Sequence, residues 1–359
     1  MSKKKVVVAM SGGVDSSVAA ALLVREDYEV IGITMRLWTD ERDDLPETNR
    51  TCCGVEAVDD AQAVAQTLNI PYYVMNFERP FQTHVVDYFT HEYSIGRTPN
   101  PCLACNQHVK FDNLLEKAKA LGADYLATGH YARVREDAGQ YRLMRGADAT
   151  KDQSYVLYTL GQPELRNLLL PVGHYTKPEI RQIARGHNLP VADKAESQDI
   201  CFIPDRDYRT FVAQRIESPA GDIVNDRGEV LGRHRGIAYY TVGQRHGLGI
   251  PSAAKLYVTR IDAVRNQIVV GPEDDLYSYE TFADDMHFVQ DAPVLPIEIS
   301  AKIRYKSQES PATLFSHDDG VRVVFREPQR AITPGQAIVF YEGDEVIGGG
   351  KIASPRFHE

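Results

Sequence analysis

The first 200 residues alternate between short apolar runs and longer segments in which apolar residues recur at helical spacing. The runs Lys5–Met10, Tyr28–Leu37, Ile70–Phe77 and Asp124–Ala132 predict strands. The segments Val14–Glu26, Val55–Asn69 and Phe111–Leu121 predict helices, the last ended by Gly122. Repeated strand–helix–strand order favours a parallel sheet covered by helices. We therefore expect an α/β domain with a doubly wound, mostly parallel sheet, whose ligand lies at the carboxyl ends of the strands.

Beyond about Asp205 the chain changes to short alternating runs separated by Gly, Pro, Asn and Asp. These runs are 236–242, 256–263, 267–270, 297–305, 312–315, 321–325, 337–341 and 345–352. Such a pattern is typical of small antiparallel sheets or barrels. The acidic stretch 272–285 is a candidate boundary between two of them. For a chain of 359 residues we expect three domains, 1–205, 206–275 and 276–359.

The composition is that of a globular chain, with 25% charged and 43% hydrophobic residues. The apolar run at residues 6–10 is too short for a signal peptide, and no stretch is long enough to span a bilayer. We therefore expect a cytoplasmic protein. Its net charge of −10 hides local blocks, because Lys and Arg outnumber acids in 225–260 and 302–330 while acids dominate 271–298. Such blocks can guide a polyanion to selected faces.

The segment Ser11-Gly-Gly-Val-Asp-Ser-Ser17 lies between the first predicted strand and the first predicted helix. Its glycines let backbone N–H groups converge on phosphate, and the amino end of the helix adds positive potential. Its serines add hydroxyl donors, and Asp15 is a candidate Mg²⁺ ligand. The loop lacks the lysine of a Walker loop and resembles the pyrophosphatase-type loop, which splits ATP into AMP and pyrophosphate. The alternative is a Ser/Gly helix cap without a ligand.

Two further residues are candidates to border an adenine. Met35 ends the second predicted strand, and Gly129 lies near the end of a later one. Either can equally be an ordinary core or turn residue.

The five cysteines are Cys52, Cys53, Cys102, Cys105 and Cys201. In a large cytosolic chain such residues more often bind metal or carry out chemistry than form disulfides. A structural zinc site normally needs four ligands. Buried, inert thiols are the favoured interpretation of the adjacent pair Cys52 and Cys53. A thiolate is both a strong nucleophile and a soft metal ligand, so sulfur chemistry is one interpretation of Cys105 and Cys201, and the resemblance carried by the motifs together favours it.

Taken together, these motifs identify a resemblance to the bacterial tRNA-specific 2-thiouridylase family over nearly the whole chain. The residues that carry it are Ala9–Ser17, Thr98–Phe111, Thr128–Ala132, Lys151–Tyr155, Ser197–Pro204, Gly243–Leu248 and Lys302–Tyr305. The resemblance implies an adenine-nucleotide α-hydrolase-like domain followed by two small β-rich domains. It also implies that ATP adenylates the 2-oxygen of a wobble uridine, which turns a poor leaving group into AMP.

The family also implies a role for particular residues. ATP would lie at Ala9, Met10, Ser11, Gly12, Gly13, Val14, Asp15, Ser16, Met35 and Gly129. Cys201 matches the persulfide carrier, which a sulfur-donor protein charges, and Cys105 matches the nucleophile. The reaction would leave a Cys105–Cys201 disulfide to be reduced. A persulfide supplies sulfur without releasing sulfide.

Other matching positions imply contacts with tRNA. The segment Asn100, Pro101 and Cys102 would lie against the target base. His130, Lys151, Asp152 and Gln153 would contact tRNA from the first domain, and Arg304, Tyr305 and Gln336 from the C-terminal barrel. A base in the single-stranded anticodon loop is held out for chemistry at modest cost. The alternative for Arg304 and Tyr305 is a solvated strand edge.

One position departs from the better-known family pattern Asn-Pro-Asp-x-x-Cys-Asn, in which the Asp is a proposed acid/base. Here that position is Cys102, and a thiol is a poor substitute for a carboxylate. Two alternatives follow. Cys102, Cys105 and Cys201 would together hold a 4Fe–4S cluster with one open iron, or Cys102 is a spare resolving thiol in a purely thiol mechanism.

Two other functions compete with this interpretation. A synthetase that adenylates a small metabolite would share the loop, but it has no need of paired sulfur-transfer cysteines. A non-catalytic RNA-binding protein would have no need of an intact Ser11–Ser17 loop.

Overall fold

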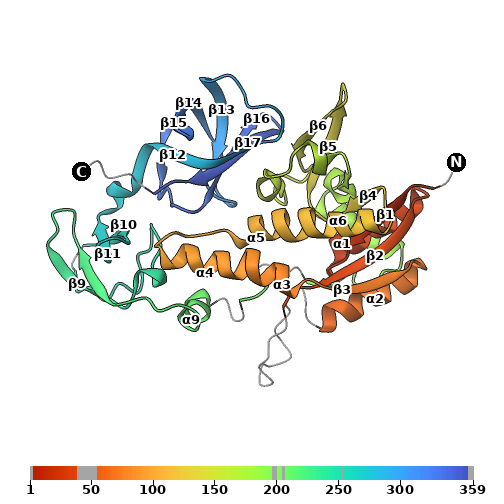
Figure 1. Ribbon diagram of the computed structural model, residues 1–359, viewed down its shortest axis with the longest axis horizontal. Helices are drawn as coiled ribbons and strands as arrows, with labels where there is room; N and C mark the ends of the chain where they lie inside the picture. Colours follow the sequence, from red (N-terminus) through yellow and green to blue (C-terminus); the bar gives the residue numbers. More distant parts are fainter. Residues whose placement is uncertain (1–2, 39–54, 196–199, 204–206, 253, 355–359) are drawn as a thin grey trace. The chain divides into compact units, whose positions relative to one another are not determined.

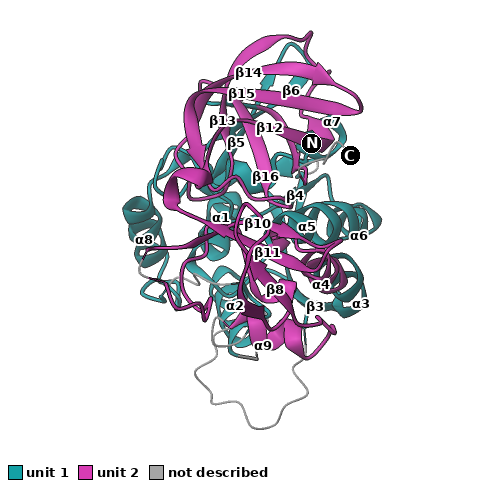
Figure 2. Cartoon of the chain, turned by 90° about the vertical axis from the view of Figure 1, so that its left-hand side faces the viewer, with its two compact units in different colours: residues 1–85, 102–206, 344–346 teal, residues 86–101, 207–343, 347–359 magenta. Residues whose placement is uncertain are grey.

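The computed structural model describes residues 3–38, 55–195, 200–203, 207–252 and 254–354 (Figure 1). The chain divides into two compact units (Figure 2). Unit 1 contains Met1–Val85, Cys102–Arg206 and Asp344–Val346, and unit 2 contains Val86–Pro101, Asp207–Gly343 and Ile347–Glu359. Each unit is therefore assembled from segments that are far apart in the sequence.

Unit 1 is built on a parallel sheet. Its strands are, in spatial order, β3 (Tyr72–Asn76), β2 (Glu29–Arg36), β1 (Lys5–Ala9), β4 (Tyr125–Ala127) and β7 (Leu168–Leu169). All the pairings between these neighbours are parallel. Val6, Val7 and Val8 are fully buried, as expected for a central strand covered on both faces. The predicted doubly wound α/β domain is confirmed.

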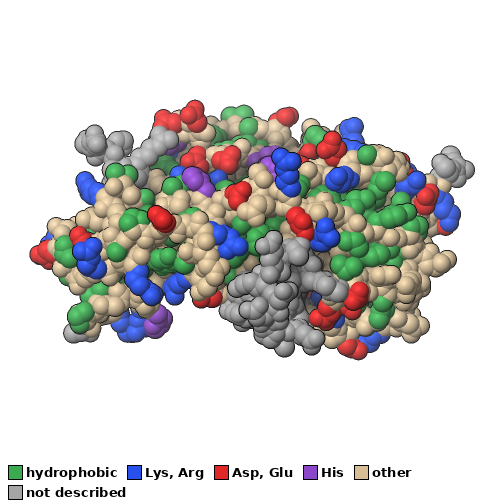
Figure 3. Space-filling model, turned by 60° about the horizontal axis from the view of Figure 1, so that its bottom comes forward, with side chains coloured by type: hydrophobic (Ala, Val, Ile, Leu, Met, Phe, Trp, Pro, Cys, Tyr) green, Lys and Arg blue, Asp and Glu red, His purple; other side chains and the backbone are tan. Residues whose placement is uncertain are grey.

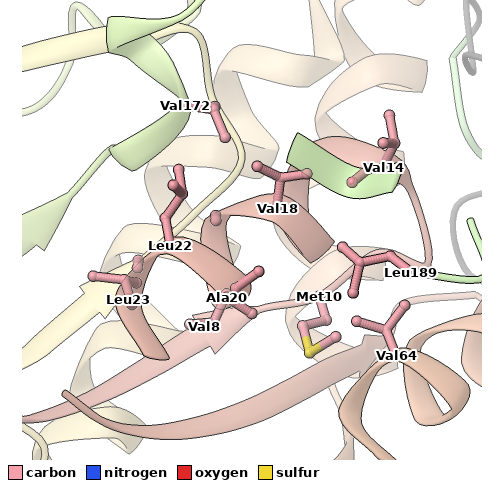
Figure 4. Close-up of a cluster of buried hydrophobic side chains, with 14 of the residues drawn as sticks. Val8, Met10, Val14, Val18, Ala20, Leu22, Leu23, Val64, Val172 and Leu189 are labelled. Carbon is pink, nitrogen blue, oxygen red and sulfur yellow. The ribbon is translucent and has the colours of Figure 1, made fainter. Parts of the chain in front are cut away.

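Helices pack on this sheet through small and branched apolar side chains. The helices are α1 (Val14–Arg25), α2 (Val55–Leu68), α6 (Leu115–Ala120) and α8 (Lys177–Gly186). In Figure 4, Met10 of the strand end, Val14 and Val18 of α1, Val64 of α2 and Leu189 belong to one buried cluster. The cluster holds the first turn of α1 against the sheet, and so it fixes the loop that precedes α1.

The segment after β3 is more helical than its sequence predicts. It comprises α3 (Glu78–Phe81), the π-helix η1 (Gln82–Val86), α4 (Asp87–Ser94), α5 (Pro101–Ala104) and the π-helix η2 (Cys105–Leu114), which continues into α6. The prediction that the helix begins at Phe111 was wrong, because helix already starts at Pro101. Pro101 does not prevent this start, because a proline is well tolerated in the first turn of a helix.

The prediction of one strand over Asp124–Ala132 was also wrong. β4 ends at Ala127, and the chain then forms an antiparallel hairpin of β5 (Ala132–Asp137) and β6 (Gln140–Arg145). The hairpin turns at Ala138 and Gly139, which both have positive φ. β6 pairs with Glu345 and Val346, the C-terminal residues that belong to unit 1.

Unit 2 contains a small sheet with its own core. The strand order is β10 (Tyr257–Asp262), β11 (Gln267–Gly271), β8 (Gly221–Val224) and β9 (Val230–His234). Ile223, Val258 and Ile268 are fully buried in its core. The predicted strand 236–242 was wrong, since this stretch contains the 3₁₀ helix η6 (Ile237–Tyr239). Gly236, with φ +145°, redirects the backbone at the point where a strand would begin.

Unit 2 also contains a closed barrel. Its strands follow the order β12 (Tyr277–Phe288), β15 (Gly320–Arg330), β14 (Ser310–His317), β13 (Ile297–Lys302), β16 (Ala337–Glu342) and β17 (Glu345–Ile352). Pairing of Ala283 with Ile352 closes it, so the barrel leaves no open edge between these two strands. Much of the acidic stretch 272–285, the candidate boundary, therefore lies within β12.

Short elements complete the chain. They are η3 (Ser154–Leu157), α7 (Gln162–Leu165), η4 (Pro171–His174), α9 (Tyr208–Ala213) and η7 (Glu273–Leu276). Within the described residues, no helix combines the length and the apolar character that crossing a membrane requires.

Candidate functional site

The loop between β1 and α1 is a tight turn made possible by glycine. Gly12 has φ +67°, and a Cβ there would lie 2.3 Å from the backbone oxygen of Ala57. Ser16 closes the turn: its Oγ accepts a hydrogen bond from the Ser11 N–H at 3.1 Å and donates to the Gly13 carbonyl at 3.2 Å. The backbone thus bends sharply into the amino end of α1, where N–H groups and the helix dipole favour an anion.

The flanking residues of the loop are anchored in the sheet. The Met10 N–H donates to the Ile33 carbonyl, and the Met10 carbonyl accepts from Thr34 Oγ1, both at 2.8 Å. The side chains of Met10 and Val14 lie in the core. These two side chains are therefore not available to a ligand at the loop, which leaves their backbone groups, as at Ala9 at the end of β1.

The two candidate adenine neighbours lie at different places. Met35 is half-buried near the end of β2 and pairs with Met75 of β3. Gly129 lies directly against the first turn of α1, since a Cβ on it would be 2.6 Å from the Ser16 nitrogen and 2.8 Å from the Asp15 carbonyl carbon. A side chain at position 129 would push against the nucleotide loop, which explains why glycine stands there.

Asp15 has two partners that sequence analysis missed. Lys177 Nζ lies 2.7 Å from one carboxylate oxygen of Asp15 and 2.8 Å from the other. The Tyr131 hydroxyl donates to Asp15 Oδ1 at 2.6 Å. The Lys177 side chain is 10% exposed and begins α8, where Thr176 and Glu179 form a capping box. That capping box was the only signal in the sequence, and it marks a helix start rather than a functional lysine.

The candidate tRNA contacts Asp152 and Gln153 hold the chain near the nucleotide loop. Gln153 binds Tyr131 twice, accepting its N–H at 2.9 Å through the side chain and donating to its carbonyl at 2.8 Å. Asp152 is buried and accepts from the Gly146 and Ser154 N–H groups and from the Ser154 hydroxyl. Gln153 therefore fixes Tyr131, and Asp152 fixes the backbone at Gly146 and Ser154. Lys151 beside them is half-buried.

His130 is buried, with 8% of its surface exposed. Its Nδ1 lies 2.7 Å from Thr128 Oγ1, and its ring lies 6.1 Å from that of Phe111. Burial, together with the positive charge of Lys110, holds the pKa of His130 well below its usual range. At neutral pH it is therefore an uncharged imidazole within the fold of unit 1.

The three candidate sulfur-transfer cysteines differ in exposure. Cys102 is exposed in α5, Cys105 is buried as the first residue of η2, and Cys201 is half-buried in a turn. π-Helical segments are rare and are often found at functional sites. The residues before Cys201 in its motif, 197–199, lie outside the described residues, as do Cys52 and Cys53.

The residues around Cys105 form a polar network. The Asn106 side chain donates to the Val156 carbonyl at 2.9 Å and accepts from Lys110 Nζ at 2.8 Å. This fixes the first turn of η2 and places a cation close to it. Among the residues that the structure describes, no group of three or more His, Cys, Asp or Glu side chains is gathered for a metal.

The remaining candidates lie in unit 2. Gln336 Nε2 donates to the Thr98 carbonyl at 2.7 Å, two residues before Asn100, and Pro101 is buried. Arg304 donates to the Arg330 carbonyl at 2.6 Å, and Lys302 Nζ lies 5.9 Å from the Tyr305 ring. The barrel therefore brings Gln336 to the segment that contains Asn100, whereas Arg304 and Tyr305 lie after β13.

The parallel sheet, the glycine turn and the amino end of α1 define unit 1 as a nucleotide-binding α/β domain. Three family models match the chain: a tRNA methyl transferase HUP domain over residues 4–205, a tRNA methyl transferase PRC-barrel domain over 209–272 and an Aminomethyltransferase beta-barrel domain over 278–352. The chain belongs to the tRNA-specific 2-thiouridylase family.

Two curated relatives show how complete the match is. The tRNA-specific 2-thiouridylase MnmA of Carboxydothermus hydrogenoformans is 53% identical over 356 residues, which cover 98% of each chain. That of Pelotomaculum thermopropionicum is 50% identical over 359 residues, covering 99% of this chain and 98% of its own. A 4-thiouridine synthetase–RNA complex with bound ATP is a more distant structural match, with 14% identity and a TM-score of 0.35 over 59% of this chain and 50% of its own.

Proposed function

We propose that this chain is an ATP-dependent tRNA sulfurtransferase that replaces the 2-oxygen of the wobble uridine with sulfur. The observation that carries the proposal is full-length identity of 53% to a tRNA-specific 2-thiouridylase. The glycine turn before α1, with Gly129 fitted against it, is the structural support for ATP use.

The reaction runs in three balanced steps. The uridine 2-oxygen attacks the α-phosphorus of ATP, and pyrophosphate leaves. The terminal sulfur of a Cys201 persulfide then attacks C2, and AMP leaves with the former 2-oxygen. The Cys105 thiolate attacks Sγ of Cys201 and breaks the S–S bond, so that the base keeps the sulfur and the two cysteines become a disulfide. An external thiol reductant returns both cysteines to thiols.

Within this scheme the nucleotide loop handles the phosphates. The N–H groups of residues 11–16 and the amino end of α1 would hold the phosphates, and Met35 and Gly129 would border the adenine. Lys177 reaches this turn through its contact with Asp15. We assign Lys177 the role of balancing the negative charge of the leaving pyrophosphate. The loop itself contains no lysine that could do so.

A Mg²⁺ ion fits this site only if Asp15 releases a partner. Both carboxylate oxygens of Asp15 are bound by Lys177, and one also by Tyr131. When bound, the ion would neutralise phosphate charge, and Asp15 is the carboxylate that would hold it. The residues supporting this role are therefore present, but they are engaged with each other.

A 4Fe–4S cluster on Cys102, Cys105 and Cys201 is the alternative to the thiol mechanism. The described residues do not gather these cysteines into a metal-binding group, and no reaction step is assigned to a cluster. Iron and sulfide analysis of anaerobically purified protein tests this directly. Stoichiometric iron that is lost in Cys102→Ala would support the cluster, and an active iron-free protein would exclude it.

The tRNA would be bound by selected contacts rather than by a uniformly basic face. Asn100, Pro101 and Cys102 adjoin the target base, with Lys151 from unit 1 and Arg304 and Tyr305 from the barrel contacting the tRNA. In Figure 3, Lys and Arg side chains are mixed with Asp and Glu over the face shown. Binding should still weaken with salt, because each phosphate contact releases counterions.

The chain would work as three domains, 1–205, 206–275 and 276–359. The separate cores of the parallel sheet, the small sheet and the barrel support this division. So do the spans of the three family models. A persulfide-donating protein would charge Cys201, and the reaction would take place in the cytoplasm, where its tRNA and ATP are found.

Mass spectrometry of nucleosides tests the proposal. Unmodified tRNA is incubated with the protein, ATP and a persulfide donor, and 2-thiouridine is measured at the wobble position. Pyrophosphate release is followed with and without tRNA. Release with a small metabolite but not with tRNA would indicate a metabolite synthetase, and tRNA binding without any release would indicate a non-catalytic RNA-binding protein.

A further inference from the structure

Thr98 is bound through all three of its polar groups. Its N–H donates to the Pro334 carbonyl at 2.9 Å, and its carbonyl accepts from Gln336 Nε2 at 2.7 Å. Its hydroxyl donates to the Thr241 hydroxyl at 3.3 Å. Two of these bonds come from the loop between β15 and β16, and the third comes from the segment that follows η6.

The barrel loop is shaped to fit this backbone. Gly335 has φ +88°, and a Cβ on it would lie 2.9 Å from the Arg97 Cβ and 3.0 Å from the Thr98 nitrogen. The Gly335 N–H donates to the Ile352 carbonyl at 3.0 Å, which ties the loop to the end of β17. The close approach therefore depends on the absence of a side chain at position 335.

Arg97 adds further contacts beside Thr98. Its N–H donates to the Glu92 carbonyl at 2.9 Å, and its Nε donates to Ser354 Oγ at 3.3 Å. The buried Glu92 carboxylate lies 3.9 Å from Arg97 Nη1. Residues 97 and 98 are thus held from the end of α4, from the barrel loop and from the chain after β17.

From these contacts we infer that the barrel loop Thr333–Gln336 positions the target-base segment Asn100–Cys102. The inference rests on the proposed function of that segment. Gln336 acts in it as a positioning residue through Thr98, in place of the tRNA contact expected from the sequence.

The residues between Thr98 and Cys102 form a stiff connection, so that the position of Thr98 constrains that of Asn100–Cys102. Pro99 and Pro101 each have φ fixed by their rings, and the residues before them, Thr98 and Asn100, are restricted by the prolines that follow. Few soft dihedral angles remain between the Thr98 carbonyl and Cys102. A backbone held at Thr98 therefore determines where the Asn100 side chain and the Cys102 thiol lie, and small displacements of reacting groups are costly.

The two roles of Gln336 make different predictions. A residue that only contacts tRNA changes the tRNA dissociation constant, and excess tRNA restores the rate. A residue that positions Asn100–Cys102 changes the rate of thiolation in the saturated complex. The decisive experiment is a single-turnover measurement of 2-thiouridine formation by the full-length protein at saturating ATP, persulfide donor and tRNA.

Three variants separate the outcomes. Gln336→Leu removes the donor to Thr98 and should lower the saturated rate by about 10-fold to 100-fold, with tRNA affinity within about twofold. Gln336→Lys keeps a donor of similar reach and should recover most of the rate. Arg304→Ala is the comparison for a tRNA contact, and its defect should appear in affinity and disappear at saturation.

A second pair of variants tests the fit of the loop. Gly335→Ala places a methyl group against Arg97 and Thr98, whereas Gly343→Ala strains a backbone of similar hand (φ +57°) in open space. Gly343→Ala should lose stability from backbone strain alone and keep the saturated rate, whereas Gly335→Ala should lose more stability and also lose saturated rate. A normal saturated rate in Gln336→Leu would overturn the inference. Failure of the wild-type protein to thiolate tRNA would instead overturn the proposed function.

Discussion

Lys177 Nζ spans both carboxylate oxygens of Asp15, at 2.7 and 2.8 Å, in the first turn of the helix that follows the nucleotide loop. The pair joins a carboxylate suited to Mg²⁺ with a cation suited to phosphate. In the structure, each of these two side chains neutralises the charge of the other.

Lys177→Met should therefore strongly reduce ATP use, although Lys177 lies 162 residues from Asp15 in the sequence. Removal of the cation leaves Asp15 facing the phosphates unopposed, and we expect pyrophosphate release to fall about 100-fold or more. Tyr131→Phe is the matched control, since it removes one hydrogen bond to the same carboxylate and no charge. Its loss should stay below about tenfold, which corresponds to about 1.4 kcal/mol and is of the size expected for one hydrogen bond. Equal rates of pyrophosphate release in Lys177→Met and wild type would show that Lys177 has no role in ATP use.

Gly129→Ala should damage the nucleotide loop without disturbing the barrel. The new methyl group would lie within 3 Å of the Ser16 and Asp15 backbone, so we expect loss of ATP binding in calorimetry together with a lower melting temperature. Gly186→Ala is the control, because a Cβ at that helical position meets nothing within 4 Å. It should gain about 0.5–1 kcal/mol of stability from helix propensity. Unchanged ATP affinity in Gly129→Ala would contradict this account of the turn.

Cys201→Ser should bind ATP and tRNA yet take no label from a ³⁵S-charged persulfide donor. Cys105→Ser should take the label on Cys201 and hold it, because the thiolate that releases the sulfur is missing. Gel autoradiography under non-reducing conditions distinguishes the two. Label retained in Cys201→Ser would mean that the persulfide forms on another residue.

His130 should make stability depend on pH below neutrality. Its pKa is lowered in the folded state by burial and by Lys110, so the unfolded chain binds a proton, with a pKa of about 6.5, before the folded chain does. The stabilisation is thus fully present above that pH and is lost as the pH falls below it, by at most about 1.4 kcal/mol per pH unit. Urea unfolding of wild type and His130→Gln at pH 7.5 and 5.5 measures the difference. A slope that His130→Gln leaves unchanged would assign the effect to other groups.

Periodicity predicted the parts of the fold that are locally determined. The apolar spacing of Val14–Glu26 found α1 to within a residue, because a buried face at helical spacing has few other solutions. The run 236–242 was mistaken for a strand, since its alternation says nothing of the backbone turn at Gly236. Period alone could not show that β6 pairs with Glu345 and Val346, about 200 residues later.

The candidate site also has parts that a local sequence pattern predicted and parts that only the structure shows. Ser11–Ser17 was predicted as a phosphate-binding loop because glycine and serine between a strand and a helix expose N–H and hydroxyl donors at the amino end of that helix. Lys177 was not predicted, since its sequence context is a capped helix start and its importance comes only from the carboxylate it meets. Gln336 was expected to contact tRNA, and its bond to the Thr98 carbonyl follows from a loop conformation that no local pattern encodes.

The interleaving of the two units has a consequence for biosynthesis. The hairpin β5–β6 leaves the ribosome long before its partner residues Glu345 and Val346 are synthesised. α4 likewise precedes its packing partners, since Phe89 and Tyr93 contact Phe211 and Tyr208. Neither unit can therefore be completed before the ribosome has passed residue 346. A chain that stopped before residue 344 would lack part of both units.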